Sequence, residues 1–231
     1  MWPYYPDLLA KPVPRYTSYP TAMEFAEDIG ASHYGEALDA LESATPVSLY
    51  VHIPYCEQIC WYCGCNTGAA NRKQRLGDYL AALHAEIALV AKRLGGRGRI
   101  GRIAFGGGSP NAIAPVELVR LIDRLQTIFA AGQPDISIEI DPRGFTAEWA
   151  LVLAASNVTR VSLGVQTFAP HIQKAIGRIQ PLAEIERTVA ALRLRGIEAI
   201  NFDLMYGLPN QSLDDLDATL DETIRLAPSR G

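Results

Sequence analysis

Residues 48–65 read SLYVHIPYCEQICWYCGC. The first six, Ser48 to Ile53, form a short apolar and β-branched run that predicts a strand. The loop that follows carries all four cysteines of the chain, between Cys56 and Cys65. In parallel α/β proteins the chemistry lies at the C-terminal ends of the strands. This stretch therefore predicts a parallel α/β fold with a chemically active first loop.

The pattern of a short strand, a loop and an amphipathic helix then repeats along the chain. The predicted strands are 48–53, 103–105, 136–140, 160–165 and 199–204. The predicted helices are 78–94, one that opens at Pro115, one from Thr146 to Asn157, 181–195, and one that opens at Ser212. Such units in sequence predict a parallel sheet with helices outside it, as in a closed or partial barrel.

The N-terminal residues 1–47 are irregular and rich in proline and tyrosine, with one short helix expected near 33–41. They contain too little apolar periodicity to fold alone. We therefore expect two parts, an N-terminal arm of residues 1–47 and a barrel domain of residues 48–231.

Composition excludes several function classes. The net charge of −4 argues against a nucleic-acid partner, which requires clustered basic residues. The one basic cluster is interrupted by glycines and is read as a solvated connection between a helix and a strand; it comprises Arg93, Arg97, Arg99 and Arg102. No secretory signal opens the chain, and no apolar stretch approaches the ~20 residues of a membrane span. We expect a cytoplasmic protein without a membrane partner.

The cysteine spacing indicates a metal centre. Cys56-x3-Cys60-x2-Cys63 suits a loop that wraps a cube-shaped iron–sulfur cluster and offers one thiolate to each of three irons. The fourth iron then stays open for a ligand. A zinc site is the alternative, although zinc sites pair two separated hooks and no second hook exists here. An inert cysteine loop is the remaining reading.

These residues resemble the signature of the radical S-adenosylmethionine superfamily, in which three such cysteines follow the first barrel strand. In that superfamily the open iron binds the amino and carboxylate groups of adenosylmethionine. Reductive cleavage then gives methionine and a 5′-deoxyadenosyl radical. Residues 106–110, GGGSP, resemble its glycine motif, with Ser109 where related enzymes carry threonine. Glycines also let a backbone approach a ligand closely.

A narrower resemblance is to the oxygen-independent coproporphyrinogen III oxidases. It is carried by residues 14–21, 50–54, 63–66, 137–143, 164–166 and 203–209. It covers residues 15–229, about half of a complete family member. It implies a partial (β/α)6 radical SAM barrel with five of six strands present and the C-terminal domain of the family absent.

The resemblance also implies roles for individual residues. The metal ligands would be Cys56, Cys60 and Cys63. The cluster-bound adenosylmethionine would be held by Tyr50, Gly107, Gly108, Ser109 and Glu139. A second adenosylmethionine would be held by Tyr62, Gln166, Arg178 and Asp203, with the backbone near Gly108 and Ser109. Cys65 would be a required cysteine that does not bind the cluster, so Cys65 and Tyr50 are the catalytic candidates.

Three side chains of the predicted barrel have simpler interpretations. Tyr50 can be a core aromatic, Arg178 a solvated arginine in a helix-rich connection, and His52 a residue that only lines the barrel. Glu139 alternates with Ile138 and Ile140, so it faces away from them. A carboxylate inside a barrel is costly unless it is paired or bound to a ligand.

The reaction that the resemblance implies is oxidative decarboxylation of two propionates of coproporphyrinogen III to vinyl groups, which gives protoporphyrinogen IX. A low-potential electron donor and a monomeric protein are implied as well. Arg15 is a candidate to bind a propionate. The alternatives are the haem-chaperone branch of the superfamily, which binds haem without making it, and a truncated, inactive cluster-binding fragment, since no sixth strand is expected after the fifth helix.

Overall fold

The computed structural model describes residues 24–26, 28–70 and 73–231. The arm motif 14–21, with Arg15, lies outside these residues. The chain divides into two compact units, Met1–Ala40 and Leu41–Gly231. In the first unit, helix α2 spans Ala31–Asp39, close to the predicted 33–41.

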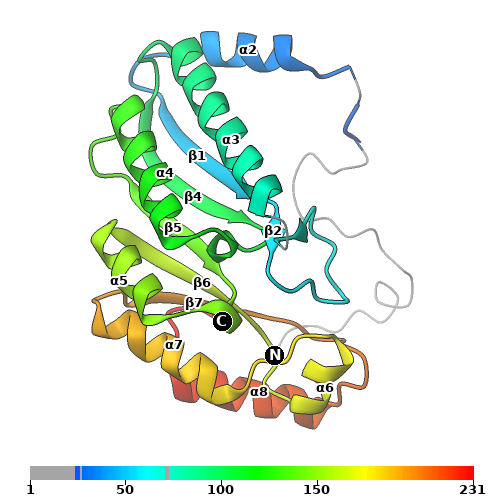
Figure 1. Cartoon of the computed structure of the whole chain (residues 1–231). Helices are drawn as coiled ribbons and strands as arrows, with labels where there is room; N and C mark the ends of the chain where they lie inside the picture. Colours follow the sequence, from blue (N-terminus) through cyan, green and yellow to red (C-terminus); the bar gives the residue numbers. More distant parts are fainter. Residues whose placement is uncertain (1–23, 27, 71–72) are drawn as a thin grey trace, which may run out of the picture. The chain divides into compact units, whose positions relative to one another are not determined.

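The second unit is built on a five-stranded parallel sheet, with strand order β1-β4-β5-β6-β7 (Figure 1). The strands are β1 (Pro46–Ile53), β4 (Arg99–Gly107), β5 (Asp135–Ile140), β6 (Val158–Gln166) and β7 (Ala199–Leu204). Every predicted strand is present, and the α/β partial barrel expected from the sequence is confirmed. Because all the strands run in parallel, their C-terminal ends lie at one edge of the sheet.

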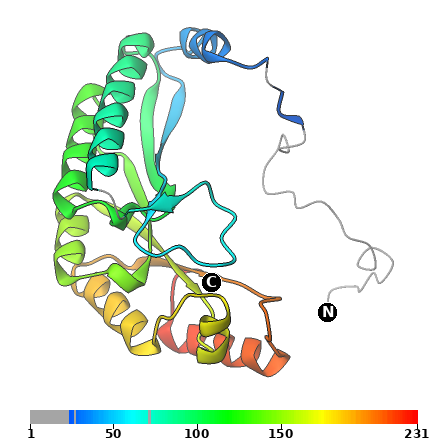
Figure 2. The same cartoon turned by 45° about the vertical axis from the view of Figure 1, so that its right-hand side comes forward.

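The main helices follow the strands and cover the outer face of the sheet (Figures 1 and 2). They are α3 (Lys73–Leu94), α4 (Pro115–Ile128), α5 (Ala147–Ala155), α7 (Leu182–Leu194) and α8 (Leu213–Leu226). The predicted start of α3, Asp78, lies inside the helix. At α8 the Ser212 hydroxyl accepts from the amide of Asp215, and the Asp215 carboxylate accepts from the amide of Ser212, so aspartate completes a capping box there.

Several short elements have no counterpart in the predicted set. They are α6 (Pro170–Ala175), the 3-10 turns η2 (Pro110–Ala112) and η3 (Pro142–Gly144), and the paired short strands β2 (Tyr55–Cys56) and β3 (Gly68–Ala69). None is long enough to show a hydrophobic period. All of them lie between main elements, where they shape the loops that form the site.

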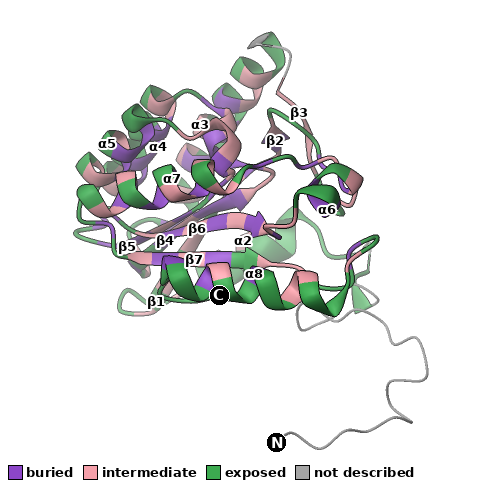
Figure 3. Ribbon diagram, turned by 90° about the horizontal axis from the view of Figure 1, so that it is seen from below, coloured by how far each residue is buried: buried purple, intermediate pink, exposed green. Residues whose placement is uncertain are grey.

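The hydrophobic core lies between the sheet and the outer helices (Figure 3). Ile136, Ile138 and Ile140 of β5 are buried, because they point toward the helices at alternate positions. The apolar stripe of α4 belongs to the same core: Leu118, Leu121, Ile122 and Leu125 are buried, and Phe129 is partly buried. The core therefore fixes the orientation of every strand.

The opposite face of the sheet is polar, because the residues between the core positions face away from the helices. These residues include Ser137, Glu139, Ser162, Asn201 and Asp203, none of which is buried. A polar inner face at the C-terminal ends of parallel strands is where a site is expected.

Because no sixth strand is expected after the fifth helix, the sequence predicts an unpaired outer edge for β7. The structure corrects this at one point, because Asn201 and Arg230 form an isolated parallel bridge. The amide of Phe202 donates to the carbonyl of Arg230 at 2.9 Å, and the amide of Ser229 donates to the carbonyl of Ile200 at 2.7 Å. Residues 229–230 thus occupy the position of a sixth strand beside β7.

Within the described part of the chain, no helix combines the length and the apolar character needed to cross a membrane.

Candidate functional site

One open cavity of about 210 Å³ lies where the strands end. It gathers side chains from the cysteine loop, from the ends of β4, β5, β6 and β7, and from the segment after α6. Predicted site residues in its lining are Cys56, Cys60, Tyr62, Cys63, Cys65, Gly107, Gly108, Ser109, Glu139, Gln166, Arg178 and Asp203. Of the predicted site residues that the structure describes, only Tyr50 does not line this cavity.

Tyr50 lies outside this cavity, in a neighbouring hollow that also contains Glu139. Its side chain is 60% exposed, so the core-aromatic interpretation is wrong. The Tyr50 hydroxyl is 3.2 Å from Nδ1 of His52, and Nε2 of His52 is 3.4 Å from the carbonyl oxygen of Asn66. His52 thus connects Tyr50 to the cysteine loop.

The cysteine loop, residues 55–69, is closed at its base. Strands β2 and β3 pair at its two ends, where the amide of Gly68 donates to the carbonyl of Pro54 at 2.8 Å and that of Ala70 to Cys56 at 2.9 Å. Its tip is fixed by the amide of Trp61, which donates to the carbonyl of Ile176 at 3.0 Å. The loop is thereby presented to the cavity as a fixed turn.

All four cysteines are free thiols, and they differ in environment. Cys60 is buried, Cys56 and Cys63 are half-buried, and Cys65 is exposed. The Sγ of Cys56 accepts a hydrogen bond from the Thr67 hydroxyl at 3.4 Å, while burial raises the pKa of this thiol. Burial, followed by the neighbouring Cys63, also raises the pKa of Cys65.

The glycine loop, residues 106–110, packs directly against the base of the cysteine loop. The amide of Gly108 donates to the carbonyl of Ile53 at 2.9 Å, and the amide of Ser109 donates to the carbonyl of Tyr55 at 2.7 Å. A Cβ atom at Gly108 would lie 2.6 Å from the carbonyl oxygen of Tyr55. These glycines are needed for close contact between two protein loops, a role that the sequence interpretation did not include.

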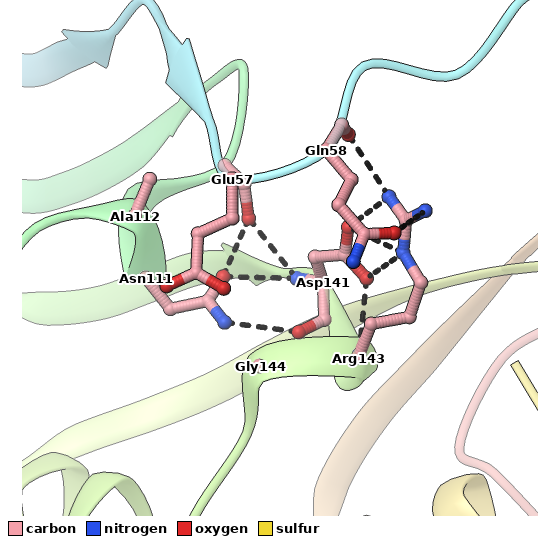
Figure 4. Close-up of a pocket in the computed structure, with 8 residues that line it drawn as sticks. Glu57, Gln58, Asn111, Ala112, Asp141, Arg143 and Gly144 are labelled. Atoms are coloured by element: carbon pink, nitrogen blue, oxygen red, sulfur yellow. Dashed lines mark hydrogen bonds and ion pairs between the residues drawn. The ribbon is translucent and has the colours of Figure 1, made fainter. Parts of the chain in front are cut away.

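The hydroxyl of Ser109 is also engaged within the protein. It donates to Oδ1 of Asn111 at 2.5 Å and accepts from the amide of Asp141 at 3.2 Å. Asn111 in turn donates to the carbonyl of Asp141 at 2.9 Å (Figure 4). Ser109 therefore ties the glycine loop to the end of β5.

Glu139 projects into the cavity from β5. Its Oε2 accepts from the amide of Gly107 at 3.4 Å. Burial raises the pKa of this carboxyl, and the nearby Asp203 raises it further. Among the described residues Glu139 has no ion pair, so the carboxylate is suited to a cationic group of a ligand.

At the neighbouring strand ends, Gln166 and Asp203 complete the polar wall. Asp203 is held by two hydrogen bonds, from the Ser162 hydroxyl at 2.8 Å and from Nδ2 of Asn201 at 2.7 Å. Gln166 ends β6 at a positive φ of 66°, next to a register shift in the pairing with β7. The irregular strand end turns the residue away from the regular ladder.

Arg178 is buried, so its interpretation as a solvated arginine is wrong. Its guanidinium donates to Gln180 Oε1, to Asp141 Oδ1 and Oδ2, to the carbonyl of Gly164 and to Cys60 Sγ, at 2.6–3.3 Å. A guanidinium has five N–H groups, and these contacts engage all of them. Arg178 is therefore a rigid part of the cavity wall.

Asp141 forms one ion pair with Arg178 and a second with Arg143, which Figure 4 shows. Burial works to raise the pKa of Asp141, but the hydrogen bonds from Arg143 and the charge of Arg178 outweigh it, and the pKa lies below its usual value. The carboxylate is thus held ionised between two guanidiniums.

The residues fit an iron–sulfur cluster. Three free cysteine thiols on one fixed loop line one cavity, and a cluster of this kind is held by cysteine thiolates. In the described ranges no group of three or more His, Cys, Asp or Glu side chains is close enough together to hold a single metal ion. A cube-shaped cluster does not require that arrangement, because each thiolate binds a different iron.

Residues 50–223 match the family model described as the Radical SAM superfamily. The chain belongs to the radical SAM superfamily. Membership implies a [4Fe–4S] cluster and S-adenosylmethionine as cofactors, in agreement with the cysteine loop and cavity of this radical SAM protein.

Similar proteins carry more specific names. The chain is 43% identical over 219 residues to an oxygen-independent coproporphyrinogen III oxidase of Bradyrhizobium diazoefficiens, covering 94% of this chain and 49% of the relative. It is 42% identical over 223 residues to the protein of that name from Pseudomonas aeruginosa, covering 94% and 48%. This radical SAM protein thus spans about half the length of the curated relatives it matches.

A solved structure agrees with this relationship. The coproporphyrinogen III oxidase HemN from Escherichia coli, described as a radical SAM enzyme, superimposes with a TM-score of 0.88 at 35% identity. The superposition covers 98% of this radical SAM chain and 51% of the other. The superposition therefore covers nearly all of this chain, which holds the cysteine loop and the cavity.

Sequence reasoning missed four polar residues of the site: Asp141, Arg143, Ser162 and Asn201. Asp141 and Arg143 lie at the end of the motif 137–143, but nothing local shows that they contact the cysteine loop. Ser162 and Asn201 alternate with apolar residues on their strands, as Glu139 does. This alternation predicts that Ser162 and Asn201 face the polar inner side of the sheet.

Replacement of Glu139 by glutamine should stabilise the apo-protein at pH 8. Folding raises the pKa of the Glu139 carboxyl above its unfolded value of 4.5. Such a group stabilises the folded state below the unfolded pKa, and this stabilisation is lost as pH rises through the folded pKa. Glu139→Gln does not titrate and keeps the acceptor for Gly107. Urea unfolding of both proteins at pH 8 and pH 4.5 measures the effect. A wild-type protein more stable than Glu139→Gln at pH 8 would contradict this account of Glu139.

Proposed function

We propose that this chain carries the catalytic site of an oxygen-independent coproporphyrinogen III oxidase. The observation that carries the proposal is the cavity itself, which gathers four cysteines, a glycine loop and the acidic strand ends. The similarity to named oxidases at 42–43% identity supports the specific activity.

Cys56, Cys60 and Cys63 would hold the [4Fe–4S] cluster, leaving one iron for adenosylmethionine. Together the two cofactors supply the one-electron chemistry that removes a hydrogen atom from the substrate. Cys65 lies on the same loop but is exposed and separated from Cys63 by one residue. We assign it to the substrate reaction rather than to the cluster.

The glycine loop and Glu139 would bind the methionine end of the first adenosylmethionine. The amides of Gly108 and Ser109 already donate to the carbonyls of Ile53 and Tyr55. The remaining hydrogen-bonding groups of these two residues' backbone are therefore carbonyl oxygens. Carbonyl oxygens and the Glu139 carboxylate both suit an ammonium group. Tyr50, beside Glu139 in the adjoining hollow, would contact the same molecule.

A second adenosylmethionine would lie against Tyr62, Gln166, Arg178 and Asp203. Asp203 is fixed by Ser162 and Asn201 as an acceptor, and it suits the hydroxyls of a ribose. All five N–H groups of Arg178 are engaged, so this residue would contact the ligand only by exchanging one of its present partners.

The substrate would be coproporphyrinogen III, with a propionate carbon presented to the cavity. Loss of a hydrogen atom from the β-carbon of the propionate, of CO2 and of one further electron, which passes to an electron acceptor, leaves a vinyl group, and two rounds give protoporphyrinogen IX. Reduction of the cluster requires a low-potential electron donor. Four free thiols suit a reducing compartment, and we propose a cytoplasmic monomer with no nucleic-acid or membrane partner.

Anaerobic reconstitution with iron and sulfide, followed by incubation with dithionite, adenosylmethionine and coproporphyrinogen III, tests the proposal. Mass spectrometry should detect 5′-deoxyadenosine together with the decarboxylated product. Cys65→Ser is the matched variant, which should keep the cluster and lose the vinyl product.

The other outcomes separate the alternatives. Formation of 5′-deoxyadenosine without a vinyl product would support the radical chemistry of this chain and contradict coproporphyrinogen III as its substrate. Tight stoichiometric binding of haem, without either product, would assign the chain to the haem-chaperone function instead.

A further inference from the structure

Two buried guanidiniums meet at the sulfur of Cys60. Its Sγ accepts from Nη1 of Arg178 at 3.2 Å and from Nη2 of Arg143 at 3.4 Å. Arg178 follows α6, whereas Arg143 lies in η3 at the end of β5. The Sγ of Cys56, by contrast, accepts from the neutral hydroxyl of Thr67. Cys60 is thus in a distinctly positive environment.

A charge count explains why Cys60 occupies this position. The side chains of Arg143 and Arg178 are 7% and 8% exposed, and both pair with Asp141, which is 16% exposed. In the described part of the chain neither arginine pairs with another carboxylate. Two positive charges and one negative charge leave a surplus in a buried place, and an uncompensated buried charge is costly. When bound to iron as a thiolate, Cys60 would be the anion within reach of both.

Arg143 donates to Cys60 but does not line the cavity that contains the cysteines. Its guanidinium donates to the carbonyl of Gln58 at 3.1 Å and to Oε1 of Gln58 at 3.2 Å, while Asp141 binds it from the other side (Figure 4). Arg143 lines a separate small hollow of about 20 Å³ rather than the cofactor cavity. It therefore acts on the sulfur without contacting a ligand in that cavity.

We propose that Arg143, oriented by Asp141, is a positioning residue for Cys60 that raises the reduction potential of the bound cluster. A hydrogen bond and a positive charge at a ligand sulfur stabilise the more negative, reduced cluster. The inference rests on the proposed function only in requiring that Cys60 binds an iron. It does not depend on the substrate.

The test is a redox titration of reconstituted wild type and Arg143→Gln, followed by electron paramagnetic resonance in the absence of adenosylmethionine. At a fixed potential the ratio of reduced to oxidised cluster should fall about tenfold in Arg143→Gln, which corresponds to a midpoint potential lower by about 59 mV for one electron. Arg120→Gln is the matched control. Arg120 is exposed on α4, paired with Glu117, and its loss should leave the potential at the wild-type value.

A fully loaded Arg143→Gln protein with the wild-type potential would overturn the inference. If Arg143→Gln holds no cluster, Arg143→Lys should still show a lower potential, because one ammonium cannot reach Gln58, Asp141 and Cys60 together. An unchanged potential in Arg143→Lys would also overturn the inference. Loss of the fold in both variants, seen by circular dichroism, would overturn the inference as well. Loss of the cluster from a folded variant would instead support the positioning role. A wild-type chain that binds no cluster refutes the proposed function itself.

Discussion

Cys60→Ser is expected to abolish formation of 5′-deoxyadenosine and to prevent stable loading of four irons. Cys60 is buried, and it is the central cysteine of the three on the loop. Substitutions around a metal ligand typically cost 10–100-fold in metal affinity or activity, so loss of a ligand should cost more than about 100-fold. Iron and sulfide analysis, together with the rate of 5′-deoxyadenosine formation, measures the effect.

Cys65→Ser provides the control on the same loop. Cys65 is exposed and is proposed not to bind the cluster, so this variant should retain the wild-type iron content. Equal loss of iron from Cys60→Ser and Cys65→Ser would contradict the assignment of three ligands. Full iron content and full activity in Cys60→Ser would contradict it more directly.

Gly108→Ala is expected to destabilise the protein by about 1–3 kcal/mol and to reduce cluster loading. The new Cβ would lie 2.5 Å from the Thr67 hydroxyl and 2.6 Å from the carbonyl oxygen of Tyr55. No side-chain rotation relieves contact with a backbone oxygen. The glycine loop must therefore move away from the cysteine loop, which breaks the hydrogen bonds that Gly108 and Ser109 donate to it.

Gly101→Ala is the matched control, because Gly101 lies on β4, the strand that ends directly before Gly108. Nothing lies within 4 Å of a Cβ built at Gly101. Its substitution should change the free energy of unfolding by no more than about 0.5 kcal/mol. Urea unfolding and iron analysis of both variants check the prediction. Equal effects of the two substitutions would show that close contact between the loops is not the cause.

The main elements of the fold were predictable because their signals are local. The apolar period of α4 marks its buried stripe, and Gly196, at φ 80°, follows the end of α7. Helix α6 has six residues, too few to show a period of 3.6, and the short pair β2 and β3 has no period at all. The pairing of Arg230 with β7 depends on tertiary position, so it could not be predicted from composition.

The site was predictable to the extent that it consists of strand ends. Parallel strands bring their C-terminal ends to one edge, so the motifs after successive strands meet in one cavity. The supporting contacts are different. Arg143 contacts Gln58 across 85 residues, and Arg178 contacts Cys60 across 118. No local pattern encodes such pairs, and so the contacts of Asp141 with Arg143 and Arg178 became visible only in the structure.

The central claim is that the cysteine loop holds a [4Fe–4S] cluster whose open iron faces a site for adenosylmethionine. Electron paramagnetic resonance of the reconstituted, dithionite-reduced chain, recorded before and after addition of adenosylmethionine, tests it most directly. The account predicts the signal of a reduced [4Fe–4S] cluster that changes on addition of adenosylmethionine and is absent from Cys60→Ser. A cluster signal that adenosylmethionine leaves unchanged, or a chain that binds no iron, would contradict it.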